Sequence, residues 1–449
     1  MELKKYKLGE ILELQRGYDL PSSQMKIGSV PVAGSNGVIG YHDTARGNYP
    51  CITVGRSGSV GKVHYYEQPT WAHNTALFVK NFKGNDPKYL YYFLKNLHLD
   101  EMFSKGSSVV PSLDRKVVHS LIVPFQEDKT CQKQIASVLS NIDRKIELNR
   151  AINQNLEAMA KQLYDYWFVQ FDFPDENGRP YKSSGGEMVW NKKLKRDIPI
   201  SWETKQIDDV AEIYNGATPS TINELNYGGD IVWITPKDLS DQKQKFVYKG
   251  ERNISQVGYD SCSTHLLPSN TILMSSRAPI GLLAISKTEL CTNQGFKSFA
   301  PKSGNIAVYL YYYLQHHIRQ IEQLGTGTTF KEVSREDILK FPILKPSDNV
   351  LDLWEEMVSS LNDRQLEIQK ENESLIKQRN ELLPLLMNGQ VSVNSDLAVI
   401  YVLISTYRKV KRVYISMAIT STFIQKSEIQ IPLLRLSMFA TLRSCSSMF

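Results

Sequence analysis

The 449-residue sequence has few cysteines, no long apolar run and no strong excess of either charge. Its five cysteines form no C-x-x-C pair, which argues against a disulfide framework or a structural zinc site and favours a reducing compartment. No stretch reaches the roughly 18 apolar residues of a membrane-spanning helix, and the first residues lead into no apolar segment typical of a secretory signal. These absences predict a soluble, cytoplasmic protein with no membrane partner and no metal site.

Apolar residues are plentiful even though long apolar runs are not. Hydrophobic residues make up 41% of the chain and aromatic residues 10%, which excludes wholesale disorder. The length predicts about three domains. The formal net charge is +6, but residues 393–449 contain 7 basic and 2 acidic residues and so supply +5 of it. The charge therefore suggests a polyanionic partner only weakly.

The chain repeats itself once. The Tyr-rich segment 89–94 recurs at 309–314, so the numbering shifts by 220 (309 minus 89). Nearer the start, Gly17 is echoed by Gly216, a shift of 199 (216 minus 17). The second copy has therefore gained about 20 residues between its start and its Tyr-rich segment, which indicates a loop insertion. Because the tyrosines have helical spacing, we expect both Tyr-rich segments to lie in cores rather than to stack on bases.

Within each copy the hydrophobic pattern changes once. Short β-rich runs at 29–32, 51–54 and 76–79 alternate with turn residues such as Ser35-Asn36-Gly37. Apolar residues four and three apart then follow, the a/d heptad pattern of a long helix that needs a partner helix. The residues predicted to form the helix–helix seam are Ile135, Leu139, Ile142, Ile146, Leu156, Leu163, Trp167, Trp354, Val358, Leu361, Ile368, Leu375, Leu382 and Leu386.

Polar residues interrupt both predicted seams. Asn149 and Asn153 occupy seam positions in the first helix, and Gln365, Asn372 and Arg379 occupy them in the second. Buried polar residues at such positions fix helix register at some cost in stability. The alternative is that these residues lie on a more hydrated stretch of the helices.

A chain ordered domain–helix–domain–helix closes on itself most simply if its helices are antiparallel. The predicted fold class is therefore α+β, with two mixed α/β domains joined by two long antiparallel α-helices, a coiled coil, with pseudo-two-fold symmetry. Proline, glycine and serine make the connector between the copies a linker by composition. The predicted segments are a first domain (1–130), a first helix (131–170), the linker (171–200), a second domain (201–346), a second helix (347–392) and a tail (393–449).

Five stretches in a fixed order connect the sequence with a known family. They are 34–41 (GSNGVIGY), 55–63 (GRSGSVGKV), 185–190 (GGEMVW), 233–235 (WIT) and 382–391 (LLPLLMNGQV). Together they resemble the DNA-specificity subunit of type I restriction-modification enzymes over about residues 1–392.

The resemblance implies a non-catalytic subunit with two target-recognition domains, each of which binds one half of a bipartite site in double-stranded DNA. Because the two copies differ in sequence, the site should be asymmetric. The resemblance also implies that the two helices act as a ruler and as a docking surface for two methyltransferase subunits, and that restriction/translocase subunits join the complex. S-adenosylmethionine, ATP and Mg would act in those partners, in a bacterial or archaeal cytoplasm, with no cofactor in this subunit.

Two other functions compete with this interpretation. One is a coiled-coil protein-interaction scaffold without DNA specificity. The other is an enzyme with a site in the Gly-rich loop 55–62. That loop fails the phosphate-binding pattern G-x-x-x-x-G-K-S/T, because Arg56 stands where glycine is required and Val63 where serine or threonine is required.

Arginines in the glycine loops of the two copies are the first candidates for DNA contact. We match Arg56 with Arg277 and assign both to phosphate positioning, because a feature shared by both domains cannot distinguish two half-sites. Base contact and a tight turn with a solvated arginine are the alternatives. We also match His73-Asn74-Thr75 with Thr292-Asn293-Gln294, where amide side chains suit adenine recognition and an Asx-turn is the alternative.

Hydroxyl-rich loops follow in both copies and precede a predicted helix, so they suit either phosphate contact or helix capping. The full set of candidate DNA-binding residues is Asn36, Arg56, Ser57, Ser59, Lys62, His73, Asn74, Lys105, Ser107, Ser108, Arg277, Asn293, Gln294, Lys297, Thr326, Thr328, Thr329 and Lys331.

The tail is the departure from the family pattern, because such chains usually finish near Val391. Residues 397–407 form a mostly apolar run too short to span a bilayer, and the basic stretch 408–412 follows it. We expect translation past a disrupted or recombined gene end rather than a folded domain, with a membrane-surface or DNA-binding appendage as the alternative.

Overall fold

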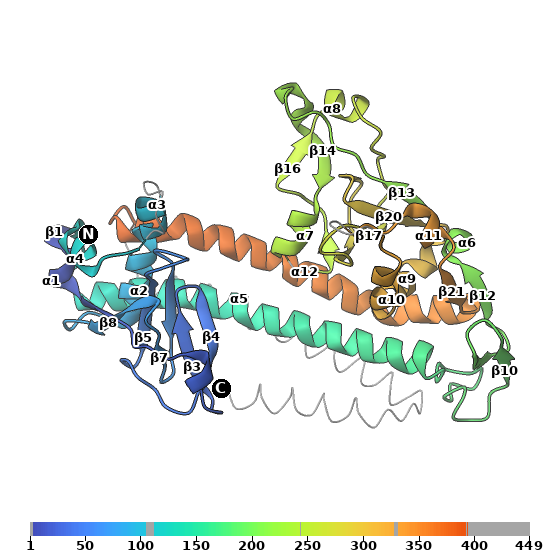
Figure 1. Cartoon of the computed structure of the whole chain (residues 1–449), viewed down its shortest axis with the longest axis horizontal. Helices are drawn as coiled ribbons and strands as arrows, with labels where there is room; N and C mark the ends of the chain where they lie inside the picture. The colour runs from blue at the N-terminus through green and yellow to red at the C-terminus, as the bar shows by residue number, and fades with distance from the viewer. Residues whose placement is uncertain (1–2, 105–111, 243, 327–330, 392, 394–449) are drawn as a thin grey trace. The chain divides into compact units, whose positions relative to one another are not determined.

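The computed structural model describes residues 3–104, 112–242, 244–326, 331–391 and 393 (Figure 1). These residues divide into two compact units. The first unit contains the chain up to Arg150 and the part that begins at Glu371, and the second contains Ala151–Lys370. The predicted tail, apart from residue 393, lies outside the described residues. No helix in the described ranges combines the length and hydropathy needed to cross a membrane.

The first unit is built on two antiparallel-rich sheets and a strand pair. The strand orders are β2-β8-β5-β6, β4-β3-β7 and β1-β9. The predicted runs at 29–32, 51–54 and 76–79 are confirmed as strands β3, β5 and β8. The elements are β1 (Lys4–Lys7), α1 (Leu8–Ile11), β2 (Glu13–Arg16), η1 (Ser22–Gln24), β3 (Val30–Gly34), β4 (Gly37–His42), β5 (Cys51–Gly55), β6 (Val63–Tyr66), β7 (Trp71–Ala72), β8 (Ala76–Asn81), α2 (Pro87–Asn96), α3 (Leu99–Ser104), α4 (Arg115–Ser120) and β9 (Ile122–Phe125).

The second unit repeats this strand order. Its sheets run β13-β20-β17-β18-β15 and β16-β14-β19, beside the pair β12-β21. The elements are β10 (Met188–Asn191), β11 (Arg196–Pro199), β12 (Glu203–Gln206), α6 (Ile207–Val210), β13 (Ala211–Asn215), η3 (Glu224–Asn226), β14 (Tyr227–Ile234), α7 (Pro236–Gln242), β15 (Phe246–Val247), β16 (Arg252–Ile254), α8 (Gln256–Asp260), β17 (Ile272–Ser275), β18 (Leu283–Ser286), β19 (Cys291–Thr292), β20 (Phe296–Pro301), η4 (Gly304–Ile306), α9 (Ala307–His316), α10 (Ile318–Gln323), α11 (Arg335–Leu339) and β21 (Pro342–Lys345).

The predicted insertion in the second copy lies between β14 and β17. It contains α7 and β15, and β15 extends the larger sheet by pairing in parallel with β18, with Phe246 opposite Ile285. The sheet order of the first unit has no strand in the place of β15, because its described sheet ends at β6. The insertion therefore adds an edge strand to one copy of a shared sheet.

The two Tyr-rich segments form helices α2 and α9, and their prediction as core is confirmed. Tyr89, Tyr92 and Phe93 are buried on α2, and every residue from 307 to 314 is buried on α9. Asp86 caps α2, because its carboxylate accepts a hydrogen bond from the Tyr89 N–H at 2.8 Å. Each helix packs into the apolar core of its own unit.

Two long helices, α5 (Lys129–Tyr164, teal) and α12 (Asp348–Met387, orange), each contribute residues to both units (Figure 1). A π-helical turn, η2 (Asp165–Val169), continues α5. Gly389, with φ of 69°, follows the end of α12, as glycine does at many helix C-termini. All predicted seam residues are buried except Leu375 and Leu382, which are half-buried.

In the first unit, α5 and α12 are connected through polar side chains. Arg379 Nη1 donates to Asp143 Oδ1 at 2.7 Å, and Asn149 Nδ2 donates to Glu371 Oε2 at 3.1 Å. As the residue number rises along α5, the number of its partner on α12 falls. This is the order of antiparallel neighbours.

The second unit has the same order of contacts. Asn153 Nδ2 donates to the Gln365 carbonyl at 3.2 Å, and the Trp167 and Trp354 rings lie 5.8 Å apart. Asn149, Gln365 and Asn372 are 1%, 4% and 7% exposed, so the alternative of a hydrated stretch is wrong for these three polar seam residues.

The segment predicted as a linker, 171–200, is folded. It contains the antiparallel hairpin of β10 and β11, in which Met188 lies opposite Pro199. Phe171, Phe173 and Ile198 are buried in the core of the second unit. Its proline and glycine content therefore reflects turns between packed aromatic residues rather than an open chain.

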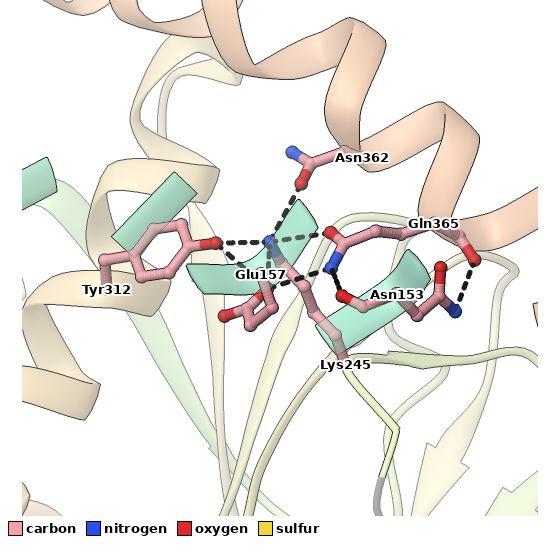
Figure 2. Close-up of polar contacts among 6 residues, drawn as sticks. All are labelled: Asn153, Glu157, Lys245, Tyr312, Asn362 and Gln365. Carbon is pink, nitrogen blue, oxygen red and sulfur yellow. Dashed lines mark hydrogen bonds and ion pairs between the residues drawn. The ribbon is translucent and has the colours of Figure 1, made fainter. Parts of the chain in front are cut away.

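A buried lysine in the insertion joins the second unit's sheet to its portions of both long helices. Lys245 Nζ lies 3.1 Å from Glu157 Oε2 on α5 and donates to Asn362 Oδ1 on α12 at 2.8 Å (Figure 2). It also donates to Tyr312 Oη on α9 at 2.6 Å and lies 3.4 Å from Gln365 Oε1. The side chain is only 6% exposed. Its pKa is lowered to about 8 by burial, which outweighs the opposing effect of Glu157.

Candidate nucleic-acid interface

The glycine loop of the first unit is a closed turn at the end of β5. The Gly55 N–H donates to the Lys62 carbonyl and the Gly61 N–H donates to the Gly55 carbonyl, both at 2.8 Å. A Cβ on Gly55 would lie 1.9 Å from the Ser59 carbonyl oxygen, so only glycine fits there. The loop thus holds the exposed Lys62, and Lys62 Nζ donates to Asn36 Oδ1 at 2.9 Å.

The second unit closes the same loop with the same backbone hydrogen bonds. The Ser275 N–H donates to the Leu282 carbonyl and the Gly281 N–H donates to the Ser275 carbonyl, both at 2.9 Å. Each of these residues lies 220 positions after its counterpart (281 minus 61, and 275 minus 55). The two loops are therefore structural equivalents with a constant offset.

This offset corrects the predicted match between Arg56 and Arg277. Arg56 donates its N–H to the Thr75 carbonyl at 2.9 Å, and in the second unit Ser276 makes the equivalent bond to Gly295 at 2.8 Å. Arg277 is instead the counterpart of Ser57 (277 minus 57 is 220). The predicted match was wrong by one residue, because it aligned two arginines rather than two backbone positions.

The same correction applies to the turn between the two sheets. His73 donates its N–H to Ala33 at 2.9 Å, and Asn293 donates to Ile234 at 3.0 Å. His73 is therefore matched by Asn293, and Asn74 by Gln294. The repeat offset of 220 was visible in the Tyr-rich segments (309 minus 89) and would have given this match from sequence alone.

The amide side chains at this turn have local partners. Asn293 Oδ1 accepts the Gly295 N–H at 2.9 Å, which confirms the Asx-turn alternative for Asn293. Asn74 Nδ2 donates to Asp19 Oδ1, and Gln294 Oε1 accepts from the Thr218 hydroxyl. Gln294 is exposed, whereas Asn74 and Asn293 are both half-buried, so Gln294 is the most accessible of these amides for base contact.

Gly17 and Gly216 hold this turn against the residues that follow β2 in the first unit and β13 in the second. A Cβ on either residue would lie 2.1 Å from a backbone oxygen, that of His73 in the first unit and that of Asn293 in the second. The repeated glycines recognised in the sequence are therefore needed for a close approach of two backbone segments, which places Asp19 and Thr218 beside the amides.

A group of three charged residues is found in the second unit. Arg277 Nε donates to Glu332 Oε2 at 3.0 Å, and Lys297 Nζ donates to Glu332 Oε1 at 3.2 Å. Burial opposes ionisation of Glu332, but the hydrogen bonds from Lys297 and Arg277 outweigh it and keep its pKa below the ordinary value. The Lys297 side chain is 7% exposed, so it supports Glu332 rather than facing solvent as a DNA contact.

The hydroxyl-rich loops are described only in part. Thr326 and Glu332 exchange two backbone hydrogen bonds of 3.1 Å, and both Thr326 and Lys331 are exposed. The other candidates in these loops lie outside the described residues: Lys105, Ser107, Ser108, Thr328 and Thr329.

The candidate residues gather at the loop ends of each sheet. Asn36 and Lys62 are in contact, and the backbones of Ser57 and Ser112 are bridged. Ser59 is half-buried within its loop. Glu332 and Thr218 were not singled out in the sequence, and the only signal for Glu332 was its offset of 220 from Ser112 (332 minus 112).

Comparison with known proteins agrees with this repeated architecture. The family model described as "Type I restriction modification DNA specificity domain" matches residues 1–158 and 199–378, more than half of the chain. The type I restriction enzyme MjaIX specificity subunit of Methanocaldococcus jannaschii is 38% identical over 199 residues, which cover 43% of this chain and 46% of that protein. The chain thus spans about half the length of that relative.

Two further proteins are similar over longer stretches. The type I restriction enzyme HindI specificity subunit of Haemophilus influenzae is 27% identical over 360 residues, or 68% of this chain and 77% of that protein. A crystal structure of the type I restriction-modification system S subunit from M. genitalium covers 86% of this chain and 96% of its own, with a TM-score of 0.57 and 16% identity, which indicates similarity of fold. Since the family model matches a segment in each repeated unit, the chain belongs to the family of type I restriction-modification DNA specificity proteins.

Proposed function

We propose that the chain directs a type I restriction-modification complex to an asymmetric bipartite site in double-stranded DNA. Each unit contacts one half of the site through its glycine loop and the adjoining turn. The chain has no catalytic role of its own, and methylation and cleavage are carried out by methyltransferase and restriction/translocase subunits. S-adenosylmethionine, ATP and Mg²⁺ act in those partners.

One observation carries this proposal. The two units share backbone hydrogen bonds at a constant offset of 220 (281 minus 61) but place different side chains at the same loop positions. Asn74 is matched by Gln294 and Ser57 by Arg277. A common scaffold with different side chains suits the recognition of two different half-sites, since base-edge contacts specify sequence whereas backbone contacts position the protein.

The long helices would set the separation of the half-sites. Helix α5 has 36 residues and α12 has 40, so each extends roughly 54–60 Å at 1.5 Å per residue. We propose that they form a continuous antiparallel coiled coil with pseudo-two-fold symmetry and dock two methyltransferase subunits. Buried polar residues such as Asn149 and Gln365 would fix the register of the pair.

The half-site proposal is tested by mapping methylation on a random DNA pool, with the full chain assembled with its methyltransferase subunits. We expect an asymmetric bipartite motif. Asn74→Ala and Gln294→Ala occupy equivalent positions, so each should relax about one base pair, in different half-sites, by roughly 1–3 kcal/mol. A motif without sequence preference, or changes confined to the same half-site in both variants, would contradict the proposal.

The ruler proposal is tested by inserting one heptad in each helix, after Arg150 and after Lys370, where the chain passes between the units. Each heptad adds about 10 Å, which corresponds to roughly 3 base pairs. We expect the spacer of the methylated motif to lengthen by that amount while both half-site sequences stay the same. An unchanged spacer in an assembled, active complex would contradict the proposal that the helices set the half-site separation.

A further inference from the structure

The charged group of Arg277, Glu332 and Lys297 in the second unit suits recognition of a base better than contact with the phosphate backbone. We propose that Arg277 recognises a guanine in the half-site bound by this unit, with Glu332 and Lys297 as positioning residues that aim its guanidinium. This inference rests on the proposed function, because it assigns one base contact within the DNA interface described above.

The two terminal nitrogens of Arg277 are available for a base. Its Nε is occupied by Glu332 Oε2 at 3.0 Å, and neither terminal nitrogen donates to any described residue. The side chain is 50% exposed. Two parallel N–H groups at the end of a guanidinium match the O6 and N7 acceptors of guanine, which is the commonest specific arginine contact in the major groove.

Glu332, which accepts the hydrogen bond from Arg277, is itself held by further contacts. Glu332 is held on its other oxygen by Lys297, whose Nζ lies 3.2 Å from Oε1 and whose side chain is 7% exposed. The backbones of Arg277 and Glu332 also form an isolated antiparallel β-bridge. A guanidinium fixed at Nε from a paired, partly buried carboxylate loses less conformational freedom on binding than a free surface arginine does.

The first unit has none of these charges at the equivalent positions. Ser57 stands in the place of Arg277, Ser112 in the place of Glu332, and Leu77 in the place of Lys297 (297 minus 77 is 220). The Ser57 and Ser112 backbones are bridged as are those of Arg277 and Glu332, so the scaffold is retained while the side chains change. The earlier reason for assigning Arg277 to phosphate, a shared arginine in both units, therefore no longer applies.

A phosphate contact would also make poor use of this arrangement. An arginine fork can bind a phosphate as well as a guanine edge, but the carboxylate of Glu332, 3.0 Å from Arg277 Nε, offsets part of the positive charge that a phosphate contact uses. The group of two cations and one carboxylate keeps a net charge of +1, but its fixed fork adds direction rather than field strength. Direction is what distinguishes one base edge from another.

The test uses the full chain assembled with its methyltransferase subunits, on a randomised DNA pool read out by methylation and binding. The main variant is Arg277→Lys, which keeps the charge and loses the fork. We expect it to reduce the preference for guanine at one base pair of one half-site by about 10-fold or more, with the salt dependence unchanged. Glu332→Gln should reduce the preference at the same base pair by a smaller factor.

Two matched variants separate the possible roles. Arg56→Lys in the first unit should leave both half-site motifs unchanged, and Ser57→Ala should leave the second half-site unchanged. If Arg277→Ala instead weakens binding to all sequences equally and lowers the salt slope by about one, and Arg277→Lys changes no base preference, Arg277 contacts phosphate and the inference is overturned.

Two outcomes distinguish the guanine contact from the proposed function. A wild-type complex with no sequence preference would overturn both. A wild-type bipartite motif whose every base pair is unaffected by Arg277→Lys would overturn the guanine contact alone. Because Arg277 is half-exposed, circular dichroism should show an unchanged fold for its lysine variant.

Discussion

The two units attach the same tyrosine to the long helices in different ways. In the first unit, Tyr92 Oη donates to Asp143 Oδ2 at 2.6 Å, and Arg379 from α12 completes the ion pair. In the second unit, the equivalent tyrosine is Tyr312 (312 minus 92 is 220), which bonds with Lys245 and with Glu157. The helices supply both charges in the first unit, whereas the inserted segment supplies the cation in the second.

The inserted segment of the second unit is part of the packed contact between the sheet and the long helices. Lys245 immediately precedes β15, the edge strand that the insertion adds, and Gln369 on α12 donates to the Phe246 carbonyl at 2.8 Å. The cation of the first unit's ion pair, Arg379, is 20% exposed and Lys245 is 6% exposed, whereas the partner carboxylates Asp143 and Glu157 are similarly exposed, at 25% and 29%. We therefore expect the second unit to depend more strongly on its polar cluster.

The largest effect should come from Lys245→Ala. Its loss would leave Glu157, which is 29% exposed, without this cation and would leave several acceptors without their donor. We expect a cost of about 3 kcal/mol, the lower end of the range for a buried pair broken from one side. Arg379→Ala in the first unit should cost less, about 1–2 kcal/mol. Chemical denaturation of the full chain, monitored by tryptophan fluorescence, measures both.

A double variant checks the cause of the Lys245→Ala effect. Lys245→Met with Glu157→Gln removes both charges, and we expect it to recover part of the lost stability.

The single variants test the comparison of the two units. Equal costs for Lys245→Ala and Arg379→Ala would show that both units depend on their polar clusters to the same extent, which would contradict the expected difference.

Stability should also depend on pH in the second unit, because a lysine can lose its proton in the accessible pH range whereas an arginine side chain in a protein does not. The pKa of Lys245 is lowered from 10.5 to about 8 by burial. Below pH 8 both folded and unfolded chains hold the proton, so the cost of burying the cation is fully present. Between about pH 8 and 10.5 the folded chain has released the proton while the unfolded chain still binds it, so stability rises with pH.

The gain should be about 3 kcal/mol across that interval at 1.36 kcal/mol per pKa unit. It is measured as the difference in unfolding free energy between wild type and Lys245→Met at pH 7.5, 9 and 10, which cancels the titration of other groups. The same difference taken against Arg379→Met should stay flat. A difference that falls with pH for Lys245 would contradict the sign.

The sequence predicted the long elements because their signals are local. The heptad spacing of Ile135, Leu139 and Ile142 identified α5, and the helical spacing of the tyrosines identified α2 and α9 as core. These patterns depend on which side of one element is apolar, which the residue order alone records. The strands β5 and β8 were likewise visible as short apolar runs.

The contacts that distinguish the units depend on residues far apart in sequence. Lys245 lies in an insertion with no counterpart in the first copy, so the repeat gave no guide to its partners Glu157 and Asn362. Glu332 meets Arg277 only because two loops 55 residues apart are bridged. The match of Arg56 with Arg277 failed for a related reason, since residue type is a poorer guide to equivalence than the backbone hydrogen bonds that shape a loop.

Removing the hydroxyl group of either tyrosine should have the smallest effects on stability. Tyr92→Phe loses one hydrogen bond, to Asp143, and should cost about 0.5–1.5 kcal/mol. Tyr312→Phe loses the bond to Glu157 and the acceptor for Lys245, so we expect about 1–3 kcal/mol. Both variants keep the ring and its packing, which makes the difference between them a measure of the polar clusters alone.

A double-mutant cycle locates the source of that difference. Combining Tyr312→Phe with Lys245→Met should cost less than the sum of the single changes, because the two side chains share a 2.6 Å hydrogen bond. Tyr92→Phe combined with Lys245→Met should be additive, since Tyr92 bonds to Asp143 in the other unit. Coupling in the second pair and additivity in the first would reverse the assignment, and the tyrosines would then owe their difference to packing rather than to the lysine.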